Sequence, residues 1–336
     1  MAITNNVSFL GQTQAQARRL NDMRALLDNL QRQATTQKKA DNYGGLGSDS
    51  LNVQRLRNVQ LLTSTYIKNA DAVAARMDIM NTSMTQMSQL GSTLRDAINL
   101  GGKTDLVAVK ELASQTLSFM RDLTNQQWDG RYIFAGSDAQ TEPFPNLSIV
   151  SFNMKDQVNQ WLAGTTTTDN MLAALNGYSG ANLGLSSGLA TSGAVTARIG
   201  QNMDIDYTVK ADDPAFQNLI RATAMLASLK EPDPANGDVA TAADFEQALQ
   251  FAVDALNAGV QDMNKAVLQL SSKYSAVGDI KKHLQTENGT FLKQIDSLEN
   301  IDPSTAIIQL QLLQSQLTAS YQVTSIVNNL SLTNFL

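Results

Sequence analysis

Side chains that could carry out chemistry are scarce in this sequence. It contains no cysteine, which removes disulfides, thiolate metal sites and cysteine nucleophiles. His283 is the only histidine, so histidine-rich metal sites, and a serine–histidine–aspartate triad built on any other imidazole, are excluded. His283 directly precedes the apolar position Leu284 of a helical repeat, and we expect it to lie at the surface. The residues predict no catalytic site, no metal site and no cofactor, and we expect the protein not to be an enzyme.

Three other patterns resemble functional motifs without completing them. Asp204 and Asp206 alternate like calcium ligands, but they lie in a strand-like run without the glycine and glutamate of a calcium loop, which favours a solvated strand face. The glycine-rich segment 44–47 lacks the lysine of a phosphate-binding loop, which favours a flexible joint between two helices. Four methionines share a heptad spacing that favours core packing over a copper site or a binding groove: Met77, Met80, Met84 and Met87.

Composition narrows the function classes further. The chain has 336 residues, which suggests about two domains, and 43% of them are hydrophobic, enough for a real core. A net charge of −6 gives no basic surface for nucleic acid. The first ten residues have neither the cationic opening nor the apolar run of a secretory signal peptide, and no stretch of about 18 apolar residues predicts a membrane span. We expect no nucleic-acid partner and no membrane partner.

Long helices must form the scaffold, because apolar residues recur at steps of three and four in both halves of the chain. In the first half the repeat predicts a helix of roughly 65–75 Å that ends at Gly101-Gly102. Its seam contains Leu56, Val59, Thr63, Tyr66, Ala70, Val73, Met77, Met80, Met84, Met87, Gly91, Leu94 and Ile98. A shorter helix follows, with Val109, Leu112, Thr116, Phe119 and Leu123 on the same spacing.

The second half of the chain contains a similar apolar repeat. A capping box at Thr241 and Asp244 predicts the start of a second long helix, in which Asn288-Gly289 would permit a kink. Its seam contains Phe245, Leu249, Ala252, Leu256, Gly259, Met263, Val267, Leu270, Tyr274, Val277, Lys281, Leu284, Phe291, Ile295 and Leu298. Between the halves, residues 131–135 and 204–209 are predicted strands, and Asp212-Asp213-Pro214 is the predicted start of a further helix.

Each end of the chain carries a helix of its own. The N-terminal stripe contains Leu20, Met23, Leu27, Leu30 and Ala34, and the C-terminal helix, which starts at Asp302-Pro303, has a stripe of Ala306, Leu310, Leu313, Leu317, Tyr321, Val327 and Leu330. The last 34 residues, 303–336, contain no charged side chain. Such a helix either docks on its own domain or is covered by neighbouring subunits, where uncharged polar groups avoid the cost of burying charge. The second interpretation is favoured, because one bundle offers too little surface to cover a helix all round.

Three segments match one known family: residues 30–57 with the joint Tyr43-Gly44-Gly45-Leu46-Gly47, residues 129–144, and residues 302–336. In them the chain resembles the flagellin superfamily, and within it the proteins of the junction between flagellar hook and filament. The most specific match is a hairpin motif with Gly130, Arg131, Tyr132, Phe134 and Gly136. Filament flagellins usually have an Asp-Asp-Ala-Ala-Gly-like joint where this chain has Asp41-Asn42-Tyr43-Gly44-Gly45, which favours a junction protein over a filament subunit.

The resemblance and the repeats together imply a mainly α fold: a long-helix, coiled-coil-like bundle formed by the N- and C-terminal halves, with a β-hairpin and a small irregular or β insertion. We expect a terminal helical core domain from residues 1–45 and 300–336. A long-helix middle domain would comprise 46–145 and 200–299, and a variable outer insertion 146–199.

The implied function is a structural one. The family implies a junction adaptor that lies outside the cell in the flagellum and is exported by the type III pathway without a cleavable signal peptide. Its implied partners are copies of itself in a ring or helical assembly, a hook-side junction protein, flagellin and an export chaperone. The expected assembly interface consists of the terminal stripes: Leu20, Met23, Leu27, Leu30, Leu310, Leu313, Leu317, Tyr321, Val327 and Leu330.

Two alternatives remain. A filament-forming flagellin subunit would share nearly all these features. A cytoplasmic signalling coiled coil would need strongly charged flanks along its heptads, and 17% charged residues is low for such a protein.

Overall fold

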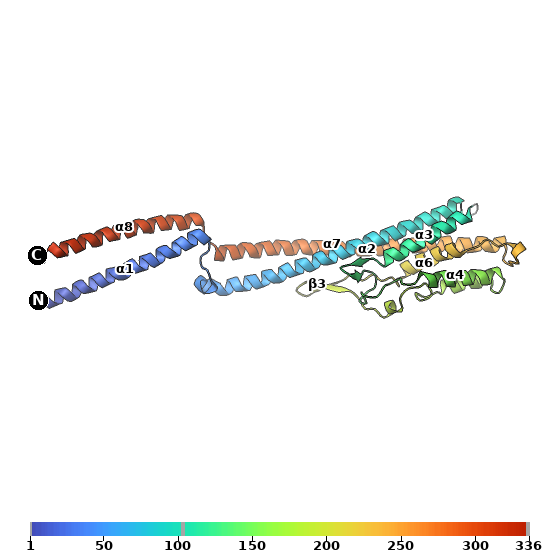
Figure 1. The fold of residues 1–336 in the computed structure, drawn as a ribbon, viewed down its shortest axis with the longest axis horizontal. Coiled ribbons are helices and arrows are strands. Elements are labelled where there is room, and N and C mark those ends of the chain that lie inside the picture. Colours follow the sequence, from blue (N-terminus) through green and yellow to red (C-terminus); the bar gives the residue numbers. More distant parts are fainter. Residues whose placement is uncertain (1, 102–104, 334–336) are drawn as a thin grey trace. The chain divides into compact units, whose positions relative to one another are not determined.

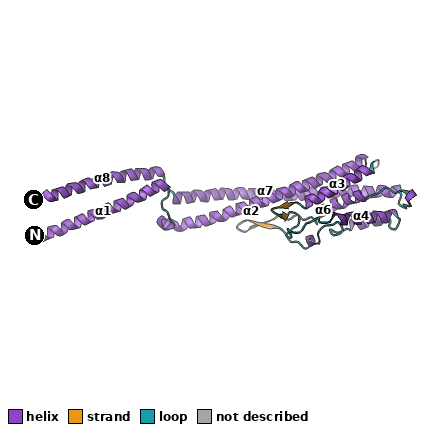
Figure 2. Cartoon of the chain, viewed as in Figure 1, coloured by secondary structure: helices purple, strands orange, loops and turns teal. Residues whose placement is uncertain are grey.

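The computed structural model describes the backbone of residues 2–101 and 105–333, and the side chains of residues 11, 14–99 and 105–326. Helices dominate this part of the chain, with two small antiparallel hairpins among them (Figure 2). The predicted fold class, mainly α with a small β portion, is confirmed.

The α-helices are α1 (Ala2–Thr36), α2 (Ser50–Gly101), α3 (Leu106–Thr124), α4 (Leu147–Leu162), α5 (Thr168–Asn176), α6 (Pro214–Ser228), α7 (Ala242–Glu299) and α8 (Pro303–Thr333). Short 3-10 turns lie at η1 (Tyr43–Asp49), η2 (Ser187–Ala190) and η3 (Pro234–Asn236). Strand β1 (Gln127–Trp128) pairs with β2 (Arg131–Tyr132), and β3 (Thr196–Gly200) pairs with β4 (Met203–Asp206). The long helices α2 and α7 begin and end close to where the apolar repeats predicted.

The chain divides into two compact units, which we describe one at a time. The terminal unit comprises Met1–Ser64 and Gln285–Leu336, and the central unit comprises Thr65–Leu284. Helices α2 and α7 contribute residues to both units. The division into three domains stays a prediction.

The central unit has one continuous apolar core. The methionine stripe of α2 is buried there, so its interpretation as core packing is confirmed. Gly91 interrupts the apolar seam for a steric reason, since a Cβ atom at this position would lie 2.8 Å from Leu219 Cδ2 and 2.9 Å from Val260 Cγ2. On α7, a Cβ at Gly259 would lie 2.9 Å from the same Leu219 atom. Glycine at both positions lets α2 and α7 approach α6 closely.

Three residues that were predicted to lie in the apolar seams are exposed. Val59 is 40% exposed, and the neighbouring Gln60 is half-buried instead, where its Nε2 donates a hydrogen bond to Asn288 Oδ1 at 3.0 Å. A polar residue can occupy a position between packed helices when a partner satisfies its hydrogen bonds. The spacing of apolar residues alone therefore predicted burial of Val59 where Gln60 is the inward residue. Phe119 of α3 is 57% exposed, because α3 contacts α6 through a neighbouring face that includes Leu117 and Met120. Tyr274 of α7 is also exposed, at 40%.

The predicted helix starts are confirmed in atomic detail. The Asp244 backbone N–H donates to Thr241 Oγ1 at 3.2 Å and the Thr241 N–H donates to Asp244 Oδ2 at 2.9 Å, which is a reciprocal capping box. Asp213 caps α6 through the Ala215 N–H. Helix α7 continues through Asn288-Gly289 as a single element.

The segment between the hairpins contains helices that the sequence analysis did not predict. Helix α4 is capped by Asn146 and α5 by Thr167, and their apolar faces join the central core. Trp161 of α4 is buried and donates from Nε1 to Thr168 Oγ1 at 3.0 Å, and Thr168 in turn donates to Asp244 of α7 at 2.6 Å. The insertion is therefore packed into the central unit and shares its core.

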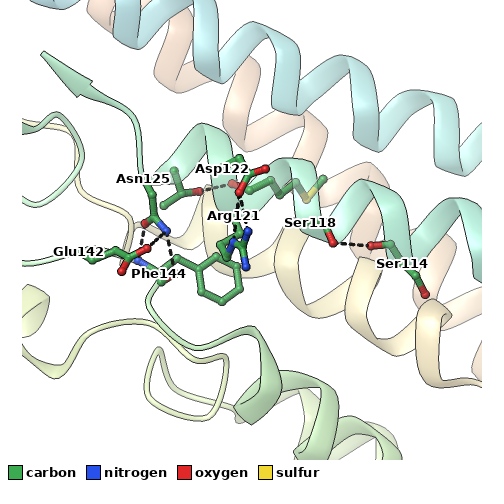
Figure 3. Close-up of polar contacts among 9 residues, drawn as sticks. Ser114, Ser118, Arg121, Asp122, Asn125, Glu142 and Phe144 are labelled. Carbon is green, nitrogen blue, oxygen red and sulfur yellow. Dashed lines mark hydrogen bonds and ion pairs between the residues drawn. The ribbon is translucent and has the colours of Figure 1, made fainter.

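A polar contact holds the chain where it leaves α3. Asn125 Nδ2 donates to Glu142 Oε1 at 2.6 Å and to the Phe144 carbonyl at 2.8 Å (Figure 3). The Phe144 N–H donates back to Asn125 Oδ1 at 2.8 Å. Because Phe144 is fully buried, this three-bond contact fixes the loop that leads from the first hairpin into α4.

The hairpin motif lies in the central unit and has a structural role. Asp129 and Gly130 both have positive φ, 52° and 69°, as a two-residue hairpin turn requires. Phe134 is fully buried, with its ring centroid 5.1 Å from that of Phe216. At Gly136, φ is 65° and a Cβ would lie 2.6 Å from Ser192 Oγ. Of the other motif residues, Arg131 is exposed and Tyr132 is half-buried.

Candidate assembly interface

The terminal unit has no core comparable to that of the central unit. Its buried apolar side chains, among those the structure describes, are Leu30, Val53, Ile295, Ala306, Leu313 and Leu317. They are spread along four helices and do not belong to the main apolar cluster.

Helices α1 and α8 contact each other and lie side by side, with both chain ends at the same end of the pair (Figure 1). The predicted stripes lie along this contact: Leu30, Leu313 and Leu317 are buried. Four further predicted residues are half-buried: Leu20, Met23, Leu27 and Leu310. These side chains pair the two ends of one chain. The side chains of the predicted residues Val327 and Leu330 lie outside the described residues.

Tyr321 makes a polar contact at the edge of this pairing. The side chain is 41% exposed, and its hydroxyl accepts a hydrogen bond of 2.8 Å from Arg24 Nε. The Arg24 guanidinium carbon also lies 5.6 Å from the centroid of the tyrosine ring, within the range of a cation–π contact. Tyr321 therefore fixes α8 against α1 by a directional contact.

A shallow groove of about 290 Å³ runs between the two helices. It is lined by Gln16, Arg19, Leu20 and Met23 of α1 and by Ala319, Ser320, Val323 and Thr324 of α8. The groove shows that α1 and α8 leave space between them on this side.

The outer surface of the pair is unusually apolar. Among the described side chains, those of Leu26, Ile307, Ile308, Leu312, Val323 and Ile326 are between 45% and 65% exposed. Leu312 is exposed while the next residue, Leu313, is buried, so α8 has apolar side chains on more than one side. Burying such a side chain from full exposure is worth about 1.5–3 kcal/mol, and roughly half of this is still available at each half-exposed position. The exposed set therefore provides a large driving force for contact with another surface.

The exposed surface of α8 also lacks charge. Among the described side chains its polar members are glutamine, serine and threonine, and these can be covered without desolvating an ion. The absence of charge was predicted from the sequence, whereas the exposed apolar residues were not. The adjacent pairs Ile307-Ile308 and Leu312-Leu313 were the available signal, because neighbouring residues on a helix point to different sides.

A bidentate contact joins α2 and α7 within the terminal unit. Arg57 Nε and Nη2 donate to Glu299 Oε1 and Oε2 at 2.8 Å and 2.6 Å, a bidentate ion pair. This hydrogen bonding lowers the pKa of the Glu299 carboxyl below its ordinary value, and nearby positive charge adds to the effect. Arg32 forms a second ion pair with Asp41, at 2.7 Å.

The described residues contain no cluster of three or more histidine, cysteine, aspartate or glutamate side chains that could hold a metal ion. His283 is exposed, and Asp204 forms a solvated ion pair with Arg198 at 2.9 Å, as expected for a strand face. None of the described helices is long and apolar enough to cross a bilayer.

Comparison with known proteins gives only distant structural likenesses. No protein-family model matches the sequence, and no curated protein is similar to it. Among solved structures, the chain is similar to a putative flagellar hook-associated protein from Vibrio parahaemolyticus, with a TM-score of 0.49 and 10% identity over 74% of this chain and 97% of that one. It is also similar to FlgL from Bacillus cereus, with a TM-score of 0.43 and 15% identity over 73% of this chain and 98% of that one.

Proposed function

We propose that this chain is a structural component of the bacterial flagellum, an adaptor at the junction between hook and filament that assembles with copies of itself through α1 and α8. The observation that carries the proposal is the surface of α8, which is free of charge and has exposed apolar side chains on more than one side. A helix with this surface gains free energy when other subunits cover it. The sequence motifs of the joint, the hairpin and the C-terminus support the flagellar assignment.

The proposal includes the partners and the location. The neighbours of the assembled chain would be further copies, a hook-side junction protein and flagellin, with an export chaperone before assembly. The chain would act outside the cell after export by the flagellar type III pathway. A filament-forming subunit is the related alternative, and the genetic test below separates the two.

The test is deletion of the gene in a strain with no second copy, followed by electron microscopy and an assay for flagellin in the medium. Bare hooks with flagellin shed into the medium are expected. Hooks with shortened or altered filaments would instead identify a filament subunit. Flagella indistinguishable from those of the parent strain would overturn both assignments.

Complementation tests the role of α8 directly. A plasmid copy carrying Ile308→Gln should fail to restore filament attachment, since Ile308 is 65% exposed and uncovered in the free chain. The matched control is Leu268→Gln, because Leu268 of the central unit is 70% exposed. Equal complementation by both variants would contradict a specific role for α8.

A further inference from the structure

Three lysines of the central unit have no acidic partner. Lys110 lies in α3, Lys155 lies in α4, and Lys230 follows the end of α6. Helices α3 and α4 both pack against α6 (Figure 1), and Leu229 beside Lys230 is fully buried, so one core holds the three positions. The ammonium groups of these lysines form no ion pair or hydrogen bond with another residue in the described part of the chain.

The three ammonium groups lie close enough to affect one another. Burial lowers the pKa of Lys110 below its ordinary value, and the neighbouring charges of Lys155 and Lys230 lower it further. Like charges that are held together cost free energy in the free chain. An anionic partner would remove that cost.

Other basic side chains of the central unit are paired with carboxylates, which sets the three lysines apart. The paired residues are Arg95, Arg121, Arg198, Lys210, Lys265 and Lys281. The lysines of α3 and α4 each precede an acidic residue, but adjacent residues on a helix point to different sides. Glu111 accepts a hydrogen bond from Gln115 at 3.1 Å. Asp156 accepts one from Gln160 at 2.8 Å, so both carboxylates are held along their own helices.

Exposed apolar side chains lie beside two of the lysines. Val107, one turn before Lys110 on α3, is 78% exposed, and Phe152, one turn before Lys155 on α4, is 70% exposed. At about 100° per residue, each lysine lies at the edge of the buried side of its helix, and the apolar residue lies further out. We call the set of Val107, Lys110, Phe152, Lys155 and Lys230 the basic face.

We propose that the basic face is a docking surface for an acidic amphipathic segment of another protein. Carboxylates of that segment would pair with the three lysines and end their mutual repulsion. Its apolar side chains would cover Val107 and Phe152, which a purely acidic chain would leave in water. A helix with one acidic and one apolar side presents both kinds of group together.

The basic face differs from the surface of α8 in both chemistry and setting. Helix α8 is uncharged, whereas the basic face combines positive charge with apolar side chains. The basic face also belongs to the central unit, whose core is formed within one chain. It is therefore available to a partner before any assembly. The inference does not depend on the proposed function, because binding is measured on the free chain.

Titration of Lys110 tests whether the lysines form one cluster. In Lys155→Gln the pKa of the Lys110 ammonium should rise relative to wild type, as measured by NMR on a chain with isotopically labelled lysine. The control is Lys265→Gln, since Lys265 lies in the same unit but pairs with Asp262 at 3.0 Å. The control should leave the titration of Lys110 unchanged. An unchanged pKa of Lys110 in Lys155→Gln would overturn the basic face.

A fluorescent synthetic peptide tests the chemistry of the partner on the full-length chain. The probe is an amphipathic helical peptide with leucine on one side and glutamate on the other, and its matched control has glutamine in place of glutamate. Fluorescence anisotropy at low salt should show that the glutamate peptide binds tighter by roughly tenfold or more. Equal binding of the two peptides, or binding of neither, would overturn the proposal.

Substitution of the lysines locates the binding. The triple variant Lys110→Gln/Lys155→Gln/Lys230→Gln should raise the Kd for the glutamate peptide by roughly tenfold or more. A control with the same change in net charge replaces three lysines of α7, and it should raise the Kd by less than about threefold. The control variant is Lys265→Gln/Lys273→Gln/Lys281→Gln. Equal losses in the two triple variants would show that binding follows net charge alone, and would overturn the basic face.

A second pair of variants tests the apolar part of the basic face. Phe152→Ser should raise the Kd for the glutamate peptide by roughly threefold to tenfold, because an exposed ring is no longer covered. The control is Phe119→Ser, since Phe119 is 57% exposed but lies beside α2. The control should leave the Kd unchanged. Equal Kd values for Phe152→Ser and wild type would exclude an apolar contribution and reduce the partner to a purely acidic one, contrary to the proposal.

A single-stranded oligonucleotide distinguishes an acidic protein segment from a nucleic acid. The net charge of −6 on the whole chain opposes the approach of a phosphate backbone. A thymidine oligonucleotide with a net charge similar to that of the glutamate peptide should therefore bind more weakly by roughly tenfold or more. Equal or tighter binding of the oligonucleotide would assign the basic face to nucleic acid and overturn the proposal.

Discussion

The terminal and central units are built from the same kind of long helix, yet they bury their apolar side chains in opposite ways. All but six of the buried apolar side chains in the described residues lie in the central unit. More than half of the large exposed apolar side chains lie in the terminal unit, although it is the smaller one. Helix α7 belongs to both, so the difference does not come from helix propensity.

The comparison shows where each unit obtains its stability. In the central unit, burial within one chain provides the free energy of folding. In the terminal unit, much of the apolar surface is still in contact with water, so the corresponding free energy becomes available only when another surface covers it. The central unit should therefore fold in the free chain, and the terminal unit should gain most of its order in an assembly.

The largest expected effect is on the central unit. Trp161→Ala removes a buried side chain of the insertion that donates to Thr168, which in turn donates to Asp244 of α7. It should lower the free energy of unfolding by about 3–5 kcal/mol. Thermal or denaturant unfolding measures the change. A loss below 1 kcal/mol would mean that the insertion does not share the core of the central unit.

The next effect concerns assembly and should leave the free chain unchanged. Ile308→Gln with Leu312→Gln should raise the concentration needed for assembly by roughly tenfold or more. The free energy of unfolding should change by less than about 0.5 kcal/mol, because both side chains are exposed. Sedimentation and denaturant unfolding separate the two quantities. A large loss of stability in the free chain would show that these side chains stabilise the terminal unit within one chain, as burial does in the central unit.

A smaller effect is expected from charge. In Gln309→Lys/Gln316→Lys the two exposed polar positions of α8 gain ammonium groups that an assembly would have to desolvate. Assembly or export should be hindered, which swarming on soft agar and an assay of secreted protein would measure. The control is Gln309→Asn/Gln316→Asn, which keeps both positions uncharged. Normal motility of the lysine variant would count against close covering of this face.

The smallest effect is the pH dependence that Glu299 gives to the terminal unit. The pKa of Glu299 is lowered by its hydrogen bonds to Arg57, so the stabilisation is present above the ordinary pKa of 4.5 and is lost as pH falls through the lower folded value. Arg57 is partly exposed, and the contribution should be about 1 kcal/mol or less. Hydrogen-exchange protection of the Lys39 and Ile301 amides should decrease in acid in wild type. The same protection should be independent of pH in Glu299→Gln.

Much of the scaffold could be predicted because its signals are local. Heptad spacing located α2 and α7, and side-chain caps located the starts of α6, α7 and α8. Spacing could not decide between Val59 and Gln60, since the choice depends on a hydrogen bond to Asn288, far away in the sequence. The helices α4 and α5 were missed because they lie in a stretch interrupted by prolines, a threonine run and repeated glycines, although Asn146 and Thr167 were available as caps.

The candidate interface was predicted only in part. The sequence shows that residues 303–336 carry no charge, but it does not show which apolar side chains α1 covers. That choice depends on how the two helices pair, and it leaves Ile308 and Leu312 outside while Leu313 and Leu317 are buried. The backbone bonds that join Lys39 to Glu299 and Ile301 to Gln37 could not be predicted, because they connect segments far apart in the sequence and do not depend on side-chain type.

The methionine stripe of α2 has a mechanical consequence. Methionine is unbranched, and its flexible side chain can change rotamer and fill a gap that a leucine or valine would leave empty. A helix packed through Met77, Met80, Met84 and Met87 can therefore bend slightly while its seam stays filled. We expect the central unit to tolerate repeated curvature at low cost in free energy, a form of compliance that would suit the junction role proposed above.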